Sequence, residues 1–282
     1  MSERKPLLFS IITPVLNGMD YLPRCVASVA DQRDVTVEHI VADGGSTDGT
    51  VEWLKGQKDV RWVSEPDHGV FEAINRGINL AKGDVLLFLN CDEQFLPGSL
   101  KFAEEEFARH PDADVIYGDL LFIHPDGSLA AVWKSYPLRW WYVVTSHLYA
   151  LTCAIFFRRR VFDEGRRFSE AWKDVGDAAL VLQLLQKGYR FRHLRRFLSA
   201  FTLTGNNRSA QSCAEAEKKQ LLAAAPAWVR HSCGLLNKLR LLEKRLYGAH
   251  KHTGDLTYDV YDSAVEAGRK HFVIQNPPVN KI

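Results

Sequence analysis

The sequence lacks the short motifs that identify many classes of protein. Its five cysteines, among 282 residues, lie far apart and include no C-x-x-C pair. An odd number of widely spaced cysteines fits reduced thiols in a cytoplasmic protein better than a disulfide framework or a zinc site. The chain also contains neither G-x-G-x-x-G nor G-x-x-x-x-G-K-[ST]. The usual fingerprints of dinucleotide-binding and P-loop proteins are therefore missing.

A long uninterrupted apolar run is missing too. Pro14 and Asn17 interrupt the apolar opening, which offers no signal-peptide cleavage site, so we interpret it as a first buried strand. The stretch 138–157 approaches membrane length, but it contains Arg139 and His147, which are costly at the centre of a bilayer. We therefore predict no transmembrane segment.

Charge of one sign is not in excess. The formal net charge is +2, and the basic stretches 158–167 and 190–196 lie beside acids and form no groove-reading element with interleaved aromatics. We expect a solvated face there and no nucleic-acid partner. With 46% hydrophobic residues, the composition is that of a globular chain that can bury a sizeable core.

Strands and helices alternate along the first half of the chain. Short apolar runs predict strands at 7–12, 38–42, 61–64, 85–89 and 115–118. The segments between them predict helices at 22–30, 50–55, 70–81 and 99–109. This alternation is typical of an α/β fold, with a mostly parallel, Rossmann-like sheet and flanking helices. Ligands of such sheets bind beyond the carboxyl ends of the strands.

Polar residues follow four consecutive predicted strands. They form the motifs TPVLN (13–17), DGGSTDGT (43–50), EPDHG (65–69) and NCDE (90–93). Asp43 comes directly at a strand end, where its carboxylate can accept hydrogen bonds from a base or a sugar. Ser46, Thr47 or Asp48 can instead cap the following helix. Taken alone, the acids of NCDE fit a solvated turn as well as a site.

These four motifs and AIFFRRRVF (154–162) resemble the family 2 glycosyltransferases of the GT-A fold. The branch they resemble most builds bacterial cell-surface polysaccharides, and the resemblance runs in order over residues 7–210. It implies an inverting transferase that uses Mn²⁺ or Mg²⁺. The expected donor is a nucleotide diphosphate sugar, most commonly a UDP sugar, and the expected acceptor is a hydroxyl of a glycan or lipid-linked glycan.

The resemblance also assigns residues to the donor side. NCDE occupies the place of the family's D-x-D motif, which makes Asp92 the expected metal ligand and Glu93 its supplement. Asn90 stands where the first acid often is, and it belongs with Cys91 to the donor pocket. Further positions expected to bind the donor are Thr13, Pro14, Asn17, Asp43, Gly44, Ser46, Asp67 and Asn75.

An inverting transferase needs a general base for the acceptor hydroxyl. The family places an acid before a late helix, and KDVGDAALVLQLLQKGYRF (173–191) offers two candidates. Asp177 matches the family position and Asp174 is the reserve. We expect the helix to begin near Ala178, so Asp177 can also serve as its N-cap.

The pattern changes after the transferase motifs. We divide the chain into a glycosyltransferase domain, 1–210, and a C-terminal helical extension and tail, 211–282. A helix predicted at 228–252 carries six lysines and arginines and one acid, and the tail from Asp255 is expected to be irregular. Its leucines form one stripe, and basic residues lie opposite: Leu235, Leu239, Leu242 and Leu246 against Arg240, Lys244 and Lys251.

This helix allows two interpretations. It can lie on an anionic membrane, which would place the enzyme at the inner face of the plasma membrane as a peripheral protein. Alternatively, the leucine stripe can dock on the catalytic domain or on a second subunit, which would make a homodimer.

Two other functions remain open. A nucleotidyltransferase that makes sugar nucleotides shares the fold type, but it needs a Gly-rich loop with Lys or Arg after the first strand, and TPVLNGMD has none. A non-catalytic sugar-nucleotide-binding protein is favoured by Asn90 in place of an acid. Slow release of nucleotide diphosphate without acceptor would distinguish an enzyme from such a binder.

Overall fold

A nine-stranded sheet organises the computed structural model, which describes residues 6–205 and 212–279. The strand order is β3-β2-β1-β4-β8-β6-β9-β5, and β7 pairs with β6. Its strands are β1 (Leu8–Val15), β2 (Thr36–Asp43), β3 (Val60–Ser64), β4 (Val85–Phe88), β5 (Glu93–Phe95), β6 (Val115–Ile123), β7 (Leu129–Trp133), β8 (Ile155–Arg158) and β9 (Phe191–Thr202). The first four strands are parallel to one another, whereas β8 runs antiparallel to both β4 and β6.

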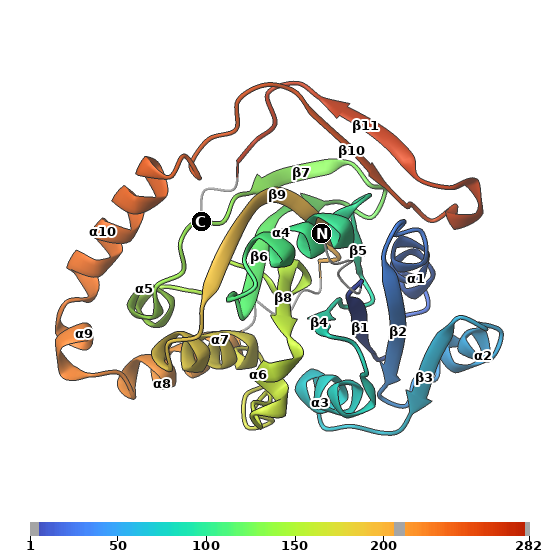
Figure 1. The fold of residues 1–282 in the computed structure, drawn as a ribbon, viewed down its shortest axis with the longest axis horizontal. Coiled ribbons are helices and arrows are strands. Elements are labelled where there is room, and N and C mark those ends of the chain that lie inside the picture. The colour runs from blue at the N-terminus through green and yellow to red at the C-terminus, as the bar shows by residue number, and fades with distance from the viewer. Residues whose placement is uncertain (1–5, 206–211, 280–282) are drawn as a thin grey trace.

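Helices flank this sheet on both sides (Figure 1). They are α1 (Leu22–Ala30), α2 (Thr50–Lys55), α3 (Val70–Leu80), α4 (Ser99–Arg109), α5 (Trp140–Thr145), α6 (Arg159–Asp163), α7 (Gly176–Gln186), α8 (Ser212–Ala223), α9 (Ala227–His231) and α10 (Cys233–Leu246). The α/β prediction is confirmed, and α1, α2 and α4 have the predicted bounds. None of the described helices combines the length and hydropathy needed to cross a bilayer.

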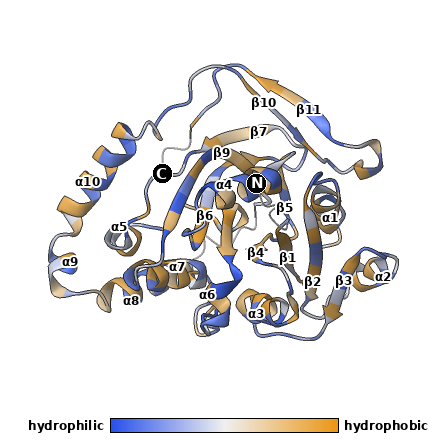
Figure 2. Ribbon diagram, viewed as in Figure 1, coloured by the Kyte–Doolittle hydropathy of each residue, from blue (hydrophilic) through white to orange (hydrophobic). Residues whose placement is uncertain are grey.

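The core lies along the middle of the sheet. Every residue of β4 and of β6 is buried, which explains why β4 is a continuous apolar run and why β6 is apolar on both faces except at Gly118 and Asp119. Figure 2 shows the central strands β1 and β4 in orange for this reason. The polar loops at their carboxyl ends are thereby held on a rigid support.

The C-terminal segment crosses the molecule in a way that the sequence did not predict. After α10 the chain forms a hairpin of β10 (Leu256–Val260) and β11 (Lys270–Ile274), which returns towards α1 (Figure 1). The prediction of an irregular tail is therefore wrong. Leu256, Tyr258 and Val260 alternate with more exposed residues and pack into a second apolar cluster with β6, β7 and β9.

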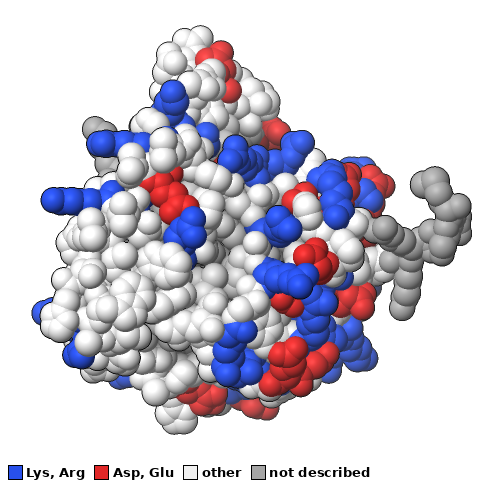
Figure 3. Space-filling view, turned by 60° about the vertical axis from the view of Figure 1, so that its left-hand side comes forward, with Lys and Arg blue, Asp and Glu red and all other residues white. Residues whose placement is uncertain are grey.

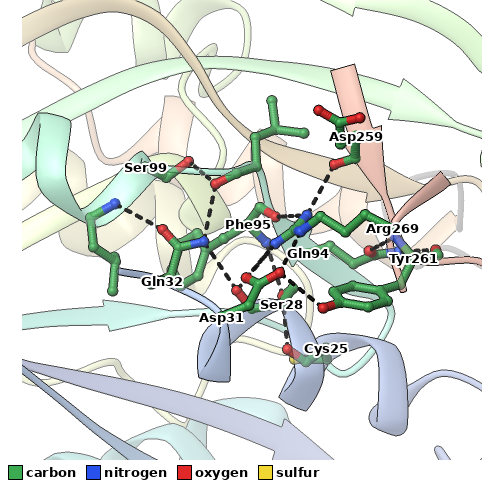
Figure 4. A network of polar contacts seen from close by, with 12 residues as sticks. Cys25, Ser28, Asp31, Gln32, Gln94, Phe95, Ser99, Asp259, Tyr261 and Arg269 are labelled. Atoms are coloured by element: carbon green, nitrogen blue, oxygen red, sulfur yellow. Dashed lines mark hydrogen bonds and ion pairs between the residues drawn. The ribbon is translucent and has the colours of Figure 1, made fainter. Parts of the chain in front are cut away.

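Side chains fasten this hairpin to the first half of the chain (Figure 4). The Arg269 guanidinium donates to both carboxylate oxygens of Asp31, over 2.6 and 2.7 Å. The Gln94 amide donates to the Tyr261 carbonyl and accepts its N–H, each over 2.8 Å. Since Gln94 lies in β5 directly after Glu93, the hairpin holds the strand that follows the NCDE acids.

The predicted helix at 228–252 is two helices, with a break at Ser232. The second, α10, ends at Leu246, and Gly248 follows with a left-handed φ of 77°, as is common after a helix. The leucine stripe faces away from the protein: the exposed fractions are 60% for Leu235, 43% for Leu239, 51% for Leu242 and 81% for Leu246. The interpretation that these leucines dock on the catalytic domain is wrong.

Candidate active site

A cavity of about 1050 Å³ lies at the carboxyl ends of the strands. Three of the four polar motifs line it: Pro14 of TPVLN, near the end of β1, Asp67 and His68 of EPDHG, and all of NCDE. The start of α7, with Asp174 and Asp177, forms part of the same cavity. The acids expected at the donor and those expected at the acceptor therefore share one space.

Asp92 and Glu93 place two carboxyl groups in a poorly solvated part of the cavity. Glu93 is 1% exposed, and its Oε2 accepts the N–H of Asn90 over 2.7 Å. Burial raises the pKa of Asp92, and burial together with the Asp92 charge raises the pKa of Glu93. The Arg24 guanidinium opposes the rise at Asp92 only in part.

A divalent cation fits these two acids. It would supply the missing positive charge, and hard cations prefer carboxylate oxygens. Within residues 6–205 and 212–279, no group of three or more His, Cys, Asp and Glu side chains is arranged to hold a metal. Asp92, with Glu93 beside it, would therefore hold the ion together with phosphate oxygens and water, the usual arrangement for Mg²⁺.

The DGGSTDGT loop is built around the Asp43 carboxylate. Asp43 is fully buried and accepts the N–H groups of Gly45 and Ser46, each over 3.0 Å. It also accepts the hydroxyls of Ser46, over 2.5 Å, and of Ser64, over 2.6 Å. Ser46 Oγ in turn accepts the N–H of Asn17, over 2.7 Å. This chain of bonds fixes the DGGSTDGT loop to the TPVLN loop.

Gly44 and Asp67 lie in direct contact. A Cβ on Gly44 would be 2.5 Å from the Asp67 Oδ2 atom, so only glycine leaves room for that carboxylate. Asp67 Oδ1 accepts the N–H of Gly69 over 3.0 Å, at the start of α3. The pair thus links two strand-end loops beside the cavity.

Six expected donor residues lie outside the cavity lining: Thr13, Asn17, Asp43, Gly44, Ser46 and Asn75. Thr13 is fully buried, with its Oγ1 2.9 Å from Nε2 of His39, because strand alternation turns it away from the face of Pro14. Asn75 bonds both the carbonyl and the N–H of Phe168, over 2.8 and 3.1 Å. It therefore fastens the loop before α7 to α3. Donor contact by any of the six residues stays a prediction.

Asp177 lies in the first turn of α7 and not before it. The helix begins at Gly176, with Val175 as its N-cap, so the N-cap interpretation of Asp177 is wrong. One carboxylate oxygen accepts the N–H of Ala178 over 2.7 Å. Burial raises the pKa of Asp177 to about 6, which suits a general base that works near neutral pH.

The fold and these loops agree with a known family. The sequence profile of glycosyl transferase family 2 matches residues 10–166. The chain belongs to this family. Among curated relatives, the chondroitin synthase and the hyaluronan synthase of Pasteurella multocida are 28% and 29% identical over 214 and 211 residues. The matches cover 74% and 73% of this chain but only 22% and 21% of those proteins.

Other family 2 relatives and solved structures are also similar. A PGL/p-HBAD biosynthesis glycosyltransferase of Mycobacterium tuberculosis is 36% identical over 121 residues, 40% of this chain and 47% of that protein. S. aureus TarS 1-349 in complex with UDP-GlcNAc has a TM-score of 0.60 at 16% identity, over 94% of this chain and 98% of that chain. The mannosyltransferase PcManGT from Pyrobaculum calidifontis, with GDP-Man and Mn²⁺, has a TM-score of 0.55 at 15% identity, over 84% and 76%. These neighbours show that the family 2 chain has the GT-A fold.

One residue of the site was not found from the family 2 motifs. Glu217 of α8 is 7% exposed, and its carboxylate accepts the N–H groups of Lys173, Asp174 and Val175 over 2.8, 2.9 and 3.0 Å. No local sequence pattern predicts a contact between residues that lie 42 to 44 positions apart. The segment that carries the candidate bases is thus held by a helix beyond the predicted domain boundary at 210.

Proposed function

We propose that this chain is an inverting, metal-dependent glycosyltransferase. It transfers a sugar from a nucleotide diphosphate donor to a hydroxyl of a glycan or lipid-linked glycan in the synthesis of cell-surface polysaccharide. The observation that carries the proposal is the shared cavity, which holds Asp92 and Glu93 at one side and Asp177 at another. The TarS complex with UDP-GlcNAc supports a UDP sugar, and the PcManGT complex supports Mn²⁺.

The chemistry divides between the two sides of the cavity. Asp177, ionised above its pKa of about 6, accepts the proton of the acceptor hydroxyl. The acceptor oxygen forms its bond to the anomeric carbon as the bond from that carbon to the donor phosphate breaks on the opposite face, which inverts the configuration. The nucleotide diphosphate leaves with the bonding electrons. A cation held by Asp92 would neutralise the negative charge of this leaving group.

Release of nucleotide diphosphate tests the proposal. We expect the full chain with Mn²⁺ to release UDP from one UDP sugar of a panel, slowly alone and faster with an acceptor. A nucleotidyltransferase would instead release pyrophosphate from a nucleoside triphosphate and a sugar phosphate. Binding of a UDP sugar without any release would leave a non-catalytic binder.

The exposed leucines of α10 support the membrane contact. Leu235, Leu239, Leu242 and Leu246, here called the leucine ridge, are flanked by the exposed cations Lys238 and Arg245. The one acid of this helix, Glu243, pairs with Arg139 over 2.8 Å. Figure 3 turns this side of the molecule forward and shows a broad area without charged side chains, bordered by lysines and arginines and by some acidic residues.

We propose that the leucine ridge contacts an anionic lipid surface, because of this charge pattern. A two-fold dimer through the ridge would bring Lys238 and Arg245 of each copy towards the same cations of the other, without acids between them. Anionic lipids offer the complementary charge, worth about 1 kcal/mol for each basic residue near the surface. The inner face of the plasma membrane is the corresponding place of work.

The basic residues that contact lipid are not the ones that the sequence suggested. Arg240 is 7% exposed and donates to the Tyr136 hydroxyl over 2.8 Å, and Lys244 is half-buried, so both face the protein. We expect co-sedimentation with phosphatidylserine vesicles, lost on Leu239→Gln with Leu242→Gln and weakened by Lys238→Gln with Arg245→Gln. Equal binding to neutral vesicles, or a dimer that those leucine substitutions dissolve, would refute the lipid contact.

A further inference from the structure

One wall of the cavity has a composition unlike that of the donor side. It is formed by α5, the loop after α5, the end of β9 and α8. Six lining residues there are aliphatic or aromatic: Val143, Val144, Leu148, Leu151, Phe201 and Leu221. Polar lining residues lie beside them: Ser146, His147, Thr152, Thr204 and Lys218. None of the six apolar side chains can form a conventional hydrogen bond. We call this set the apolar wall.

A sugar ring is poorly matched to the apolar wall. Each buried hydroxyl without a partner costs about 1–3 kcal/mol, and a pyranose brings several hydroxyls. Stacking of the sugar ring on an aromatic side chain does not replace the missing hydrogen bonds at this wall. Phe122 and Trp133 are only 9% and 7% exposed and pack edge-to-face, and Phe201 packs the same way on Phe122. Little of the Phe122 and Trp133 rings is therefore open to a sugar.

A hydrocarbon group is well matched to the same surface. Each methylene removed from water contributes about 0.8 kcal/mol, whichever chain carries it. Because the apolar wall and Asp177 line one cavity, such a group would lie near the hydroxyl that gives up its proton. We propose that the acceptor carries an alkyl or aryl group close to its reactive hydroxyl, and that the apolar wall binds this group. The proposal rests on the proposed transferase function.

Matched acceptors test this assignment. Methyl glycosides of a panel of sugars are compared with their octyl counterparts, below the micelle concentration, and UDP release from the UDP sugar found active above is measured. We expect the octyl acceptor of the preferred sugar to have a KM at least tenfold below that of the methyl acceptor. Leu221→Ser should remove most of this difference, whereas Leu222→Ser, its neighbour outside the cavity lining, should keep it.

The possible outcomes distinguish a failure of the transferase function from a failure of the apolar subsite. No UDP release with any donor and acceptor would refute the transferase function itself. UDP release with equal KM values for methyl and octyl acceptors would overturn only the apolar subsite. An octyl preference that Leu222→Ser removes as fully as Leu221→Ser would also overturn it. Donor hydrolysis without acceptor serves as the measure of correctly folded protein in each variant.

A second inference comes from Glu217 and is independent of the cavity wall. The backbone N–H groups at a helix start lack partners within the helix. At α7 the Asp177 carboxylate accepts the N–H of Ala178, but no side chain caps the helix at Val175. The Glu217 carboxylate, on α8, instead accepts three N–H groups directly before the helix, and its charge is favourable at that end of the helix dipole.

We infer that Glu217 is a positioning residue for the general base. Its three bonds fix Lys173, Asp174 and Val175, and the chain then enters the α7 turn that carries Asp177. The placement of a base matters steeply, since a displacement of about 1 Å can reduce turnover about 100-fold. Loss of Glu217 would release the segment without touching the donor side.

The test compares two substitutions with a matched control. Glu217→Ala should lower kcat at least tenfold per folded molecule, with the donor KM nearly unchanged, and Glu217→Gln should restore part of kcat because one amide oxygen still accepts. Glu38 also accepts backbone N–H groups, from Lys82 and Gly83, away from the cavity. Glu38→Ala should therefore lower stability but not kcat per folded molecule. An unchanged kcat in Glu217→Ala, or an equal loss in both alanine variants, would overturn the positioning role.

Discussion

Replacing Asp177 by Asn should change activity and stability in opposite directions. Asparagine keeps an oxygen that can accept the Ala178 N–H but cannot take a proton from the acceptor. We expect kcat to fall by about 10²- to 10⁴-fold, the usual contribution of a general base, with donor affinity nearly kept. In the unmodified enzyme, kcat/KM should rise with pH up to about 6 and then level off, because only the ionised carboxylate can act.

The stability change follows from the same carboxylate. Its pKa rises from 3.8 to about 6 on folding, so the folded protein holds the proton more tightly than the unfolded chain does. Ionisation of Asp177 therefore lowers the free energy of unfolding. This loss is zero well below pH 3.8 and grows between pH 3.8 and 6. Above that range the cost is constant at about 3 kcal/mol, as an upper bound. Asparagine avoids this cost.

Urea denaturation at several pH values measures the effect. At pH 7.5 the Asn variant should be more stable than the parent by up to about 3 kcal/mol, and the gain should shrink as the pH falls towards 4. Asp174→Asn serves as the control for activity, since Asp174 is the reserve base. Full turnover in Asp177→Asn with loss in Asp174→Asn would show that the base was wrongly assigned. A stability gain that does not depend on pH would refute the explanation by burial.

Three other substitutions test separate parts of the site and fold. Asp92→Asn should abolish Mn²⁺-dependent donor binding with the fold intact by circular dichroism; turnover at the parent rate would exclude Asp92 as the metal ligand. Gly44→Ala places a Cβ 2.5 Å from Asp67 Oδ2 and should raise the donor KM at least tenfold, and an unchanged KM would show that the Asp67 position does not matter. Arg269→Ala should reduce the free energy of unfolding by about 2–3 kcal/mol, because it leaves Asp31 without its ion pair, and a loss below about 0.5 kcal/mol in urea would contradict this.

Sequence patterns within one segment predicted the helices whose bounds depend on that segment alone. The helices α1, α2 and α4 have the expected bounds because amphipathic spacing and turn residues determine them within one segment. Strand β9 was missed because its first half, RFRHLRR, reads as a charged surface. In the structure Arg195 and Arg196 are exposed and their guanidinium groups lie over the rings of Tyr247 and Phe102, at 3.9 and 4.4 Å. Cation–π contacts between distant segments leave no periodic signal.

The site was predictable as far as strand topology determines it. Motifs at the carboxyl ends of parallel strands meet at one edge, which brought NCDE and EPDHG to the same cavity. Alternation along a strand turned Thr13 inward, and a strand boundary uncertain by a residue or two cannot reveal that. Glu217 lay beyond prediction because only the tertiary packing of α8 brings it to α7.

The helical periodicity of α10 was correct, but periodicity does not say which face packs inward. Tertiary bonds decide it here: Arg240 reaches the Tyr136 hydroxyl, and Glu243 pairs with Arg139, both on the side opposite the leucine ridge. A polar face can therefore be the docked face when each charged group on it finds a partner. The leucines then remain outside, where they need another surface to cover them.

Residues beyond position 210 contact both acid-bearing segments of the cavity. Glu217 holds the segment before α7, and the hairpin, through Tyr261, holds Gln94 beside the NCDE acids. Both come from the region beyond the predicted boundary, and each supports one of the two acid-bearing segments of the cavity. The leucine ridge lies between these two contacts in the chain. The C-terminal region is therefore bonded both to the strand that contains Glu93 and to the segment before α7, and a protein reduced to residues 1–210 would lose both supports together.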